Sequence, residues 1–118
     1  MIKGIGLDMI DLDRVKQAVE KNPRFIERIL TEKETKQYEK YEGSRKIEFL
    51  AGRFAAKEAY AKANGTGFGK HLSFTDVEIL QVEDGRPHVT MPIKQGETVF
   101  VSITHTARSA AAQVIIEQ

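Results

Sequence analysis

Apolar residues dominate the first ten positions of the chain. Residues 2–10 are mostly apolar and include Gly4 and Gly6. This composition predicts a buried strand that lets another backbone or a ligand approach closely at the glycines. Asp8 interrupts the apolar run, so the strand carries a carboxylate that needs a hydrogen-bond partner or a cation if it is buried.

Helix signals follow this strand. The helical pattern begins at Asp13, and Asn22-Pro23 is a stop and restart, because Asn can cap a helix and Pro is tolerated in a first turn. The sequence therefore predicts one helix before this step and a second helix over residues 23–30.

The longest predicted helix lies in the centre of the chain. Thr31 and Glu34 have the spacing of a capping box and mark the start of an intervening helical segment. Ser44 then precedes residues 45–64, which are rich in Ala, Lys, Glu and Phe and favour a helix. Gly65 is expected to end it, since glycine is the usual residue just past a helix C-terminus.

The rest of the chain has the short, alternating pattern of strands. A step of Asp84-Gly85 between two apolar runs is a hairpin signal. The predicted strands cover residues 74–82, 89–93, 99–103 and 109–116. No linker or repeat divides the chain, so we expect one α+β domain over residues 1–118, with an antiparallel sheet from both chain ends packed on the long central helix.

Composition narrows the class of protein. The 118 residues are 41% hydrophobic and 30% charged, which fits a globular domain. No apolar run reaches the roughly 18 residues of a membrane span, and no signal-peptide pattern is present. The chain has no cysteine, so a metal would be held by oxygen or imidazole, and we expect a cytoplasmic protein without a membrane partner.

The long helix carries candidate catalytic residues. Glu58 and Lys62 are four residues apart and share one helix face with Phe54. On its own, this spacing is typical of an exposed ion pair. If the helix covers the first strand, however, Asp8 and Glu58 converge, and two carboxylates with open positions suit Mg²⁺.

Two further features have structural and functional interpretations. Gly65, Gly67 and Gly69 follow the helix and could free backbone N–H groups for an anion, but their position after the helix favours a plain helix end and turn. His105 lies at the end of a predicted strand, where it either binds a phosphate or caps the turn. No nucleophile triad and no zinc spacing is visible.

Basic residues concentrate in the first half of the chain. Although the net charge is only +1, residues 1–62 hold 14 Lys and Arg against 11 Asp and Glu. Four of these basic residues have helical spacing and are expected to form one basic stripe. Such a stripe fits an acidic helix or a nucleic-acid backbone, and the near-neutral total and 8% aromatic content favour the acidic protein over nucleic acid. The stripe consists of Arg14, Lys21, Arg24 and Arg28.

The quoted residues resemble one family almost end to end. Gly4-Ile5-Gly6-Leu7-Asp8 with Arg14, and Arg53-Phe54-Ala55-Ala56-Lys57-Glu58 with Lys62, are similar to the two signatures of the holo-[acyl-carrier-protein] synthases. These are small 4′-phosphopantetheinyl transferases. Asn64 stands where the family usually has a small apolar residue. Gly65-Thr66-Gly67, Gly85-Arg86-Pro87 and Ser102-Ile103-Thr104-His105 follow in the order of the family.

The resemblance implies an activity and its substrates. The expected reaction transfers 4′-phosphopantetheine from coenzyme A to a serine of apo acyl carrier protein, for fatty acid biosynthesis, and releases adenosine 3′,5′-bisphosphate. Asp8 and Glu58 would hold Mg²⁺, Lys62 would neutralise the pyrophosphate, and Glu58 is a candidate base. The basic stripe would dock the carrier protein. The residues implied to bind coenzyme A are Arg45, Lys46, Arg53, Lys62, Gly65, Gly85, Arg86, Pro87, Thr104 and His105.

The family also implies a homotrimer whose active sites lie between protomers, with Arg45, Lys46, Arg53 and His105 supplied by the adjacent chain. Two alternatives stay open at this point. One is a non-catalytic module that uses the basic stripe to bind an acidic protein or nucleic acid. The other is a hydrolase that cleaves phosphate esters with the same metal.

Overall fold

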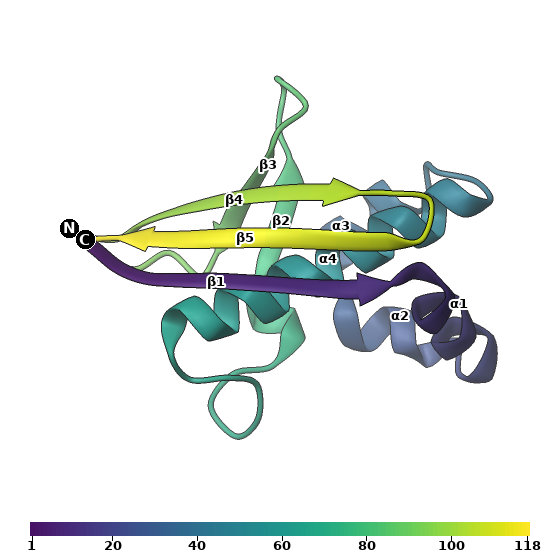
Figure 1. Cartoon of the computed structure of the whole chain (residues 1–118), viewed down its shortest axis with the longest axis horizontal. Coiled ribbons are helices and arrows are strands. Elements are labelled where there is room, and N and C mark those ends of the chain that lie inside the picture. Colours follow the sequence, from purple (N-terminus) through teal and green to yellow (C-terminus); the bar gives the residue numbers. More distant parts are fainter.

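The two ends of the chain pair with each other in an antiparallel sheet (Figure 1). In the computed structural model, which describes residues 1–118, the strand order of this sheet is β1-β5-β4. Gly6 lies opposite Val114, and Ser102 opposite Gln113. The strands are β1 (Ile2–Asp11), β2 (Glu78–Gln81), β3 (Pro87–Met91), β4 (Thr98–His105) and β5 (Ser109–Glu117).

The helices occupy the chain between β1 and β2, as the sequence predicts. They are α1 (Leu12–Lys21), α2 (Arg24–Ile29), α3 (Glu32–Tyr38) and α4 (Ser44–Asn64). Asn22 and Pro23 separate α1 from α2, and Thr31 forms the predicted capping box with Glu34. Gly65 ends α4 with a φ of 79°, in the left-handed region that favours glycine. None of the helices combines the length and apolar character needed to cross a membrane.

The hairpin departs from the predicted single sheet. β2 and β3 form a separate two-stranded antiparallel sheet that projects beside β4 (Figure 1). The predicted strand over residues 74–82 is also too long. Its first part is the 3₁₀ turn η1 (Phe74–Asp76), because the Asp76 carboxylate accepts a hydrogen bond from the Ser73 N–H at 2.9 Å and closes a turn there.

Helix α4 lies directly against β1 at the two glycines. A Cβ at Gly6 would lie 1.8 Å from the carbonyl oxygen of Ala59, and one at Gly4 would lie 1.9 Å from that of Ala63. No side chain fits at either position, so the predicted close approach is confirmed. Facing the sheet, α4 presents small residues that are fully or almost fully buried, namely Ala55, Ala56, Ala59 and Ala63.

The other face of β1 is open. The sequence predicts a buried strand, but Ile5, Leu7 and Met9 are between 56% and 69% exposed in the single chain. The strand is an edge strand, and α4 covers one of its faces only. Phe100 on β4 continues this apolar surface and is 52% exposed.

A buried ion pair joins the helices to the hairpin. Lys57 and Glu34 have fully buried side chains, and Lys57 Nζ lies 2.6 Å from Glu34 Oε1. Lys57 also donates to the carbonyl oxygens of Ile29 and Phe74, while Glu34 Oε2 accepts from the Ile79 N–H at 2.7 Å. Burial lowers the pKa of Lys57, and the Glu34 carboxylate acts in the opposite direction. One pair therefore connects α4, α2, α3, η1 and β2.

Removing one partner of this buried ion pair should destabilise the protein. We expect Lys57→Met to lower the free energy of unfolding by about 3–5 kcal/mol, because it leaves the Glu34 carboxylate buried without a cation. Urea unfolding followed by circular dichroism measures the change. Lys40→Met, at an exposed position, is the control and should change stability by less than about 0.5 kcal/mol. A loss below about 1 kcal/mol for Lys57→Met would contradict this account of the pair.

Candidate functional site

Asp8, Glu58 and Lys62 meet where α4 crosses β1. Lys62 Nζ lies 2.9 Å from Asp8 Oδ1 and donates to the carbonyl oxygen of Leu7 at 3.0 Å. The ion pair suggested by helical spacing, between Glu58 and Lys62, does not form, because Asp8 binds the lysine instead. Asp8 is on the face of β1 that is turned toward α4, as Gly4 and Gly6 are.

The charges around Glu58 affect its titration. The pKa of Glu58 is raised, first by burial and second by the negative charge of Asp8, while the positive charge of Lys62 opposes the rise. Carboxylate and carbonyl oxygens are the donors that Mg²⁺ prefers, and this ion commonly takes one or two carboxylates and completes its shell with water and phosphate. The donor set of Asp8 and Glu58, half-buried and open to solvent, therefore fits that ion.

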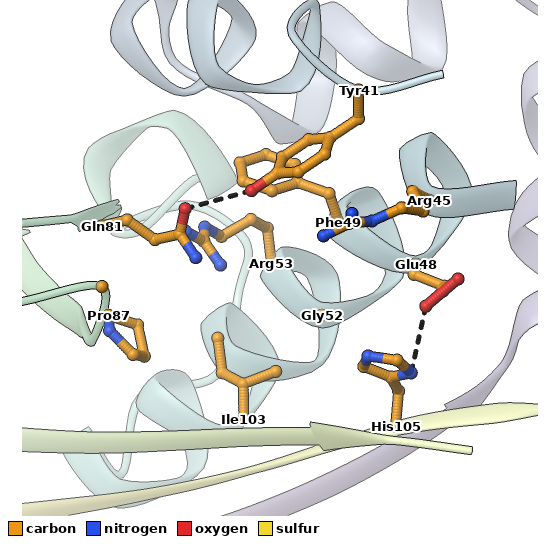
Figure 2. A pocket seen from close by; sticks show the side chains of 11 residues that line it. Tyr41, Arg45, Glu48, Phe49, Gly52, Arg53, Gln81, Pro87, Ile103 and His105 are labelled. Carbon is orange, nitrogen blue, oxygen red and sulfur yellow. Dashed lines mark hydrogen bonds and ion pairs between the residues drawn. The ribbon is translucent and has the colours of Figure 1, made fainter. Parts of the chain in front are cut away.

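A second group of candidate residues lines a pocket of about 250 Å³ between the first half of α4, β4 and the hairpin (Figure 2). Arg45 and Arg53 come from α4, His105 from the end of β4, and Gly85 and Pro87 from the hairpin. The pocket is lined in addition by residues that sequence reasoning did not select, namely Tyr41, Glu48, Phe49, Gly52, Gln81 and Ile103.

Arg53 is the most constrained cation of this pocket. It is only 4% exposed, its Nε donates to the carbonyl oxygen of Ile79 at 2.8 Å, and its guanidinium lies 4.3 Å from the ring centre of Phe49. Burial lowers its pKa to about 10, so the group stays charged at neutral pH. Its Nη2 is buried without a hydrogen-bond partner in the chain. A buried donor of this kind is expensive to leave unpaired, so the pocket is suited to an anion.

The remaining candidates lie outside the pocket. The ammonium of Lys46 lies over the ring of Tyr38, 5.1 Å from its centre. Arg86 pairs with Asp84 at 2.6 Å in the hairpin turn, and it lines a neighbouring groove. Gly65 ends α4 three residues after Lys62, and Thr104 is exposed beside His105.

The two groups of residues lie on opposite edges of the three-stranded sheet. Asp8 belongs to β1 and His105 to β4, and β5 runs between these strands (Figure 1). Along α4, Lys62 lies nine positions after Arg53, which corresponds to about 14 Å of helix. Within one chain, the acidic cluster (Asp8, Glu58 and Lys62) and the basic pocket (lined by Arg45, Arg53 and His105) therefore lie in separate places.

The basic stripe is exposed and has no ion pairs. Arg14 and Lys21 are on α1, and Arg24 and Arg28 are on α2, so the four residues of the stripe belong to two separate helices. Phe25 and Ile26, which follow Arg24 on α2, are half-buried and pack against the core, and the ring of Phe25 stacks on that of Phe54.

Comparisons with known proteins agree with this architecture. The family model described as "4'-phosphopantetheinyl transferase superfamily" matches residues 4–115. The chain belongs to this superfamily. A holo-[acyl-carrier-protein] synthase of Listeria welshimeri is 94% identical over 117 residues and covers 99% of each chain. One from Anoxybacillus flavithermus is 54% identical over 118 residues, which are 100% of this chain and 98% of the relative.

Solved structures extend the similarity to the fold. A holo-(acyl-carrier-protein) synthase of Bacillus anthracis in complex with CoA (3',5'-ADP) superposes with a TM-score of 0.91 at 47% identity, covering 100% of this chain and 98% of that one. The Helicobacter pylori synthase in complex with coenzyme A has a TM-score of 0.84 at 30% identity, over 96% and 99% of the two chains. These similarities confirm the predicted α+β fold and the predicted transferase class. They do not support the alternative of a non-catalytic binding module.

The proximity of the two carboxylates can be tested by titration. Asp8→Asn should lower the pKa of Glu58, because the Asp8 charge raises it, and Lys62→Met should raise it further, because the lysine charge opposes the rise. NMR of the side-chain carboxyl carbon of Glu58 measures both shifts. Asp13→Asn, an exposed change on α1, is the control. If Glu58 titrates identically in wild type and Asp8→Asn, the two groups do not share a site.

Proposed function

We propose that the chain, as one domain over residues 1–118, transfers 4′-phosphopantetheine from coenzyme A to a serine of apo acyl carrier protein and releases adenosine 3′,5′-bisphosphate. The observation that carries this proposal is the meeting of Asp8, Glu58 and Lys62, since two carboxylates and an ammonium suit attack on a pyrophosphate. The product supplies holo carrier protein for fatty acid biosynthesis. The proposal places the reaction in the cytoplasm, because a chain without cysteine suits a reducing compartment.

The residues of the acidic cluster divide the chemistry between them. Asp8 and Glu58 would hold Mg²⁺, which when bound draws charge from the phosphorus under attack and from the departing phosphate. Lys62, already at 2.9 Å from Asp8, neutralises the same pyrophosphate. The serine hydroxyl must lose a proton as its oxygen attacks, and Glu58 is the candidate acceptor, directly or through a water molecule.

The basic pocket would bind the adenosine end of coenzyme A. Arg45, Arg53 and His105 supply positive charge or donors, and Nη2 of Arg53 has no acceptor within the chain. Gly85 and Pro87 border the pocket, while Lys46, Arg86 and Thr104 are close enough in sequence to extend the contact at its rim. Gly65, just after Lys62, would contact the pantetheine side.

The separation of the two groups supports sites shared between copies of the chain. The open face of the sheet exposes Ile5, Leu7 and Met9 on β1 and Phe100 on β4, and exposed apolar side chains gathered on one face are of the kind that marks an interface. Packing of this face against neighbouring copies would bring the acidic cluster of one protomer to the basic pocket of the next. We propose a homotrimer assembled in this way.

The basic stripe would dock the carrier protein. Its four exposed side chains make no ion pair within the chain, so they are available to an acidic helix, and Phe25 and Ile26 add apolar contact.

The transfer itself is tested with purified protein, Mg²⁺, coenzyme A and apo carrier protein. Mass spectrometry should show one phosphopantetheine added to the carrier serine, and Glu58→Gln should slow the reaction at least about 100-fold without lowering the melting temperature. Glu39→Gln, at an exposed position, is the matched control. Cleavage of coenzyme A without an acceptor would support a hydrolase instead, and an unmodified carrier would refute the transferase.

Shared sites predict complementation between inactive variants. Asp8→Asn and the double variant Arg45→Ala/His105→Ala should each be nearly inactive alone. When equal amounts of the two are refolded together, one site in three of every mixed ring combines an intact acidic cluster with an intact pocket. These are about a quarter of all sites, so activity should recover to about a quarter of wild type. Mixtures that gain nothing over the separate variants would mean that each chain carries a complete site.

Charge reversal tests the docking surface. Arg28→Glu should raise the KM for the carrier protein several-fold at low salt, where surface electrostatics are strongest, and leave the KM for coenzyme A unchanged. Lys33→Glu, an exposed position outside the stripe, should change neither constant. An unaltered carrier KM in Arg28→Glu at low salt would exclude the stripe as the docking site.

A further inference from the structure

One carboxylate lines a pocket whose other charged groups are arginines. Glu48 shares the pocket with Arg45 and Arg53, where a negative charge should weaken the binding of an anion. Its Oε2 lies 3.1 Å from Nδ1 of His105, across the gap between α4 and β4 (Figure 2). The direct partner of the carboxylate is therefore the imidazole ring.

Glu48 contacts His105 although Arg45 is also a possible partner. Arg45 lies one helical turn before Glu48, a spacing at which opposite charges commonly pair. No such pair forms, and the guanidinium of Arg45 instead lies over the ring of Tyr41, 5.3 Å from its centre. His105 is the last residue of β4 and its side chain is 53% exposed, so packing alone does not hold its ring in one orientation.

The contact of Glu48 with Nδ1 of His105 leaves the other ring nitrogen to face the pocket. An ionised carboxylate only accepts hydrogen bonds, so its contact with Nδ1 favours the ring form that carries a hydrogen on that nitrogen. Figure 2 shows the other ring nitrogen of His105, Nε2, on the side turned toward the middle of the pocket. With a carboxylate at Nδ1 and an anion at Nε2, the ring bridges both groups when it carries a hydrogen on each nitrogen.

We propose that Glu48 is a positioning residue that orients His105 toward the 3′-phosphate of coenzyme A. The inference rests on the proposed function, in which the pyrophosphate belongs to Asp8, Glu58 and Lys62. The phosphate left for the basic pocket is then the one on the ribose. Glu48 touches no substrate and acts through His105, so its removal affects recognition of that phosphate and leaves the chemical step intact.

Binding and kinetics together test this role. Calorimetry with adenosine 3′,5′-bisphosphate should show about tenfold weaker binding for Glu48→Ala, the effect of losing one charge-assisted hydrogen bond. The double variant Glu48→Ala/His105→Ala should bind no more weakly than His105→Ala alone, because Glu48 acts through the ring. In the transfer assay, Glu48→Ala should raise the KM for coenzyme A with kcat unchanged, and it should not affect 3′-dephospho-coenzyme A.

Two variants separate orientation from charge and from folding. Glu48→Gln retains an oxygen that accepts from Nδ1, so it should recover part of the lost affinity. Glu42→Ala, an exposed residue before α4, removes the same charge nearby and should bind normally. Tighter binding in Glu48→Ala would show that the carboxylate only repels the ligand, and additive losses in the double variant would overturn the positioning role. Failure of the wild type to bind the bisphosphate would instead refute the proposed ligand.

Discussion

The backbone contact between α4 and β1 determines the geometry of the acidic cluster. Gly4 and Gly6 allow the helix to lie against the strand with no side chain between them, since a Cβ at either position would overlap a helix carbonyl oxygen. The next residue on the same face of β1 is Asp8, and the helix residue above it is Lys62. The distance of 2.9 Å between them follows from the glycines two and four residues earlier. A larger residue at Gly6 would raise the helix and separate Lys62 and Glu58 from Asp8.

The buried pair of Lys57 and Glu34 serves the other side of the same helix. Lys57 precedes Glu58 in the sequence, so the two side chains leave α4 in different directions. The Lys57 side chain is fully buried in the interior, whereas Glu58 is half-buried at the acidic cluster. The glutamate partner also holds the Ile79 N–H of β2, which positions the strand whose carbonyl oxygen accepts from Arg53. The pair therefore supports the basic pocket through the hairpin as well as holding α4.

Sequence reasoning succeeded where the signal is local. The stop at Asn22-Pro23, the capping box of Thr31 and Glu34, and the glycine after α4 each depend on neighbouring residues, and the structure confirms all three. The meeting of Asp8 with the long helix was inferred from the cost of a carboxylate in an apolar strand, a physical argument that needs no contact map.

Pairings between distant residues were missed. Glu34 has a complete local explanation as a capping residue, so nothing in its surroundings indicates that its carboxylate also neutralises Lys57, 23 residues later. Glu48 and His105 are 57 residues apart, and only the packing of α4 beside β4 brings them together. The sequence does not predict the separate sheet of the hairpin for the same reason. Turn chemistry predicts that β2 and β3 pair with each other, but it does not indicate which strands lie beside them.

The exposed apolar face of the sheet and the division of the site share one physical cause. The three-stranded sheet is covered by helix α4 on one side, and its other side is exposed in the single chain. In the homotrimer proposed above, association of copies would bury that face. The edge strands β1 and β4 of neighbouring copies would then come close, so residues on opposite edges of one chain could act on one substrate. A large phosphorylated ligand that exceeds what one small domain can enclose would then be bound by two.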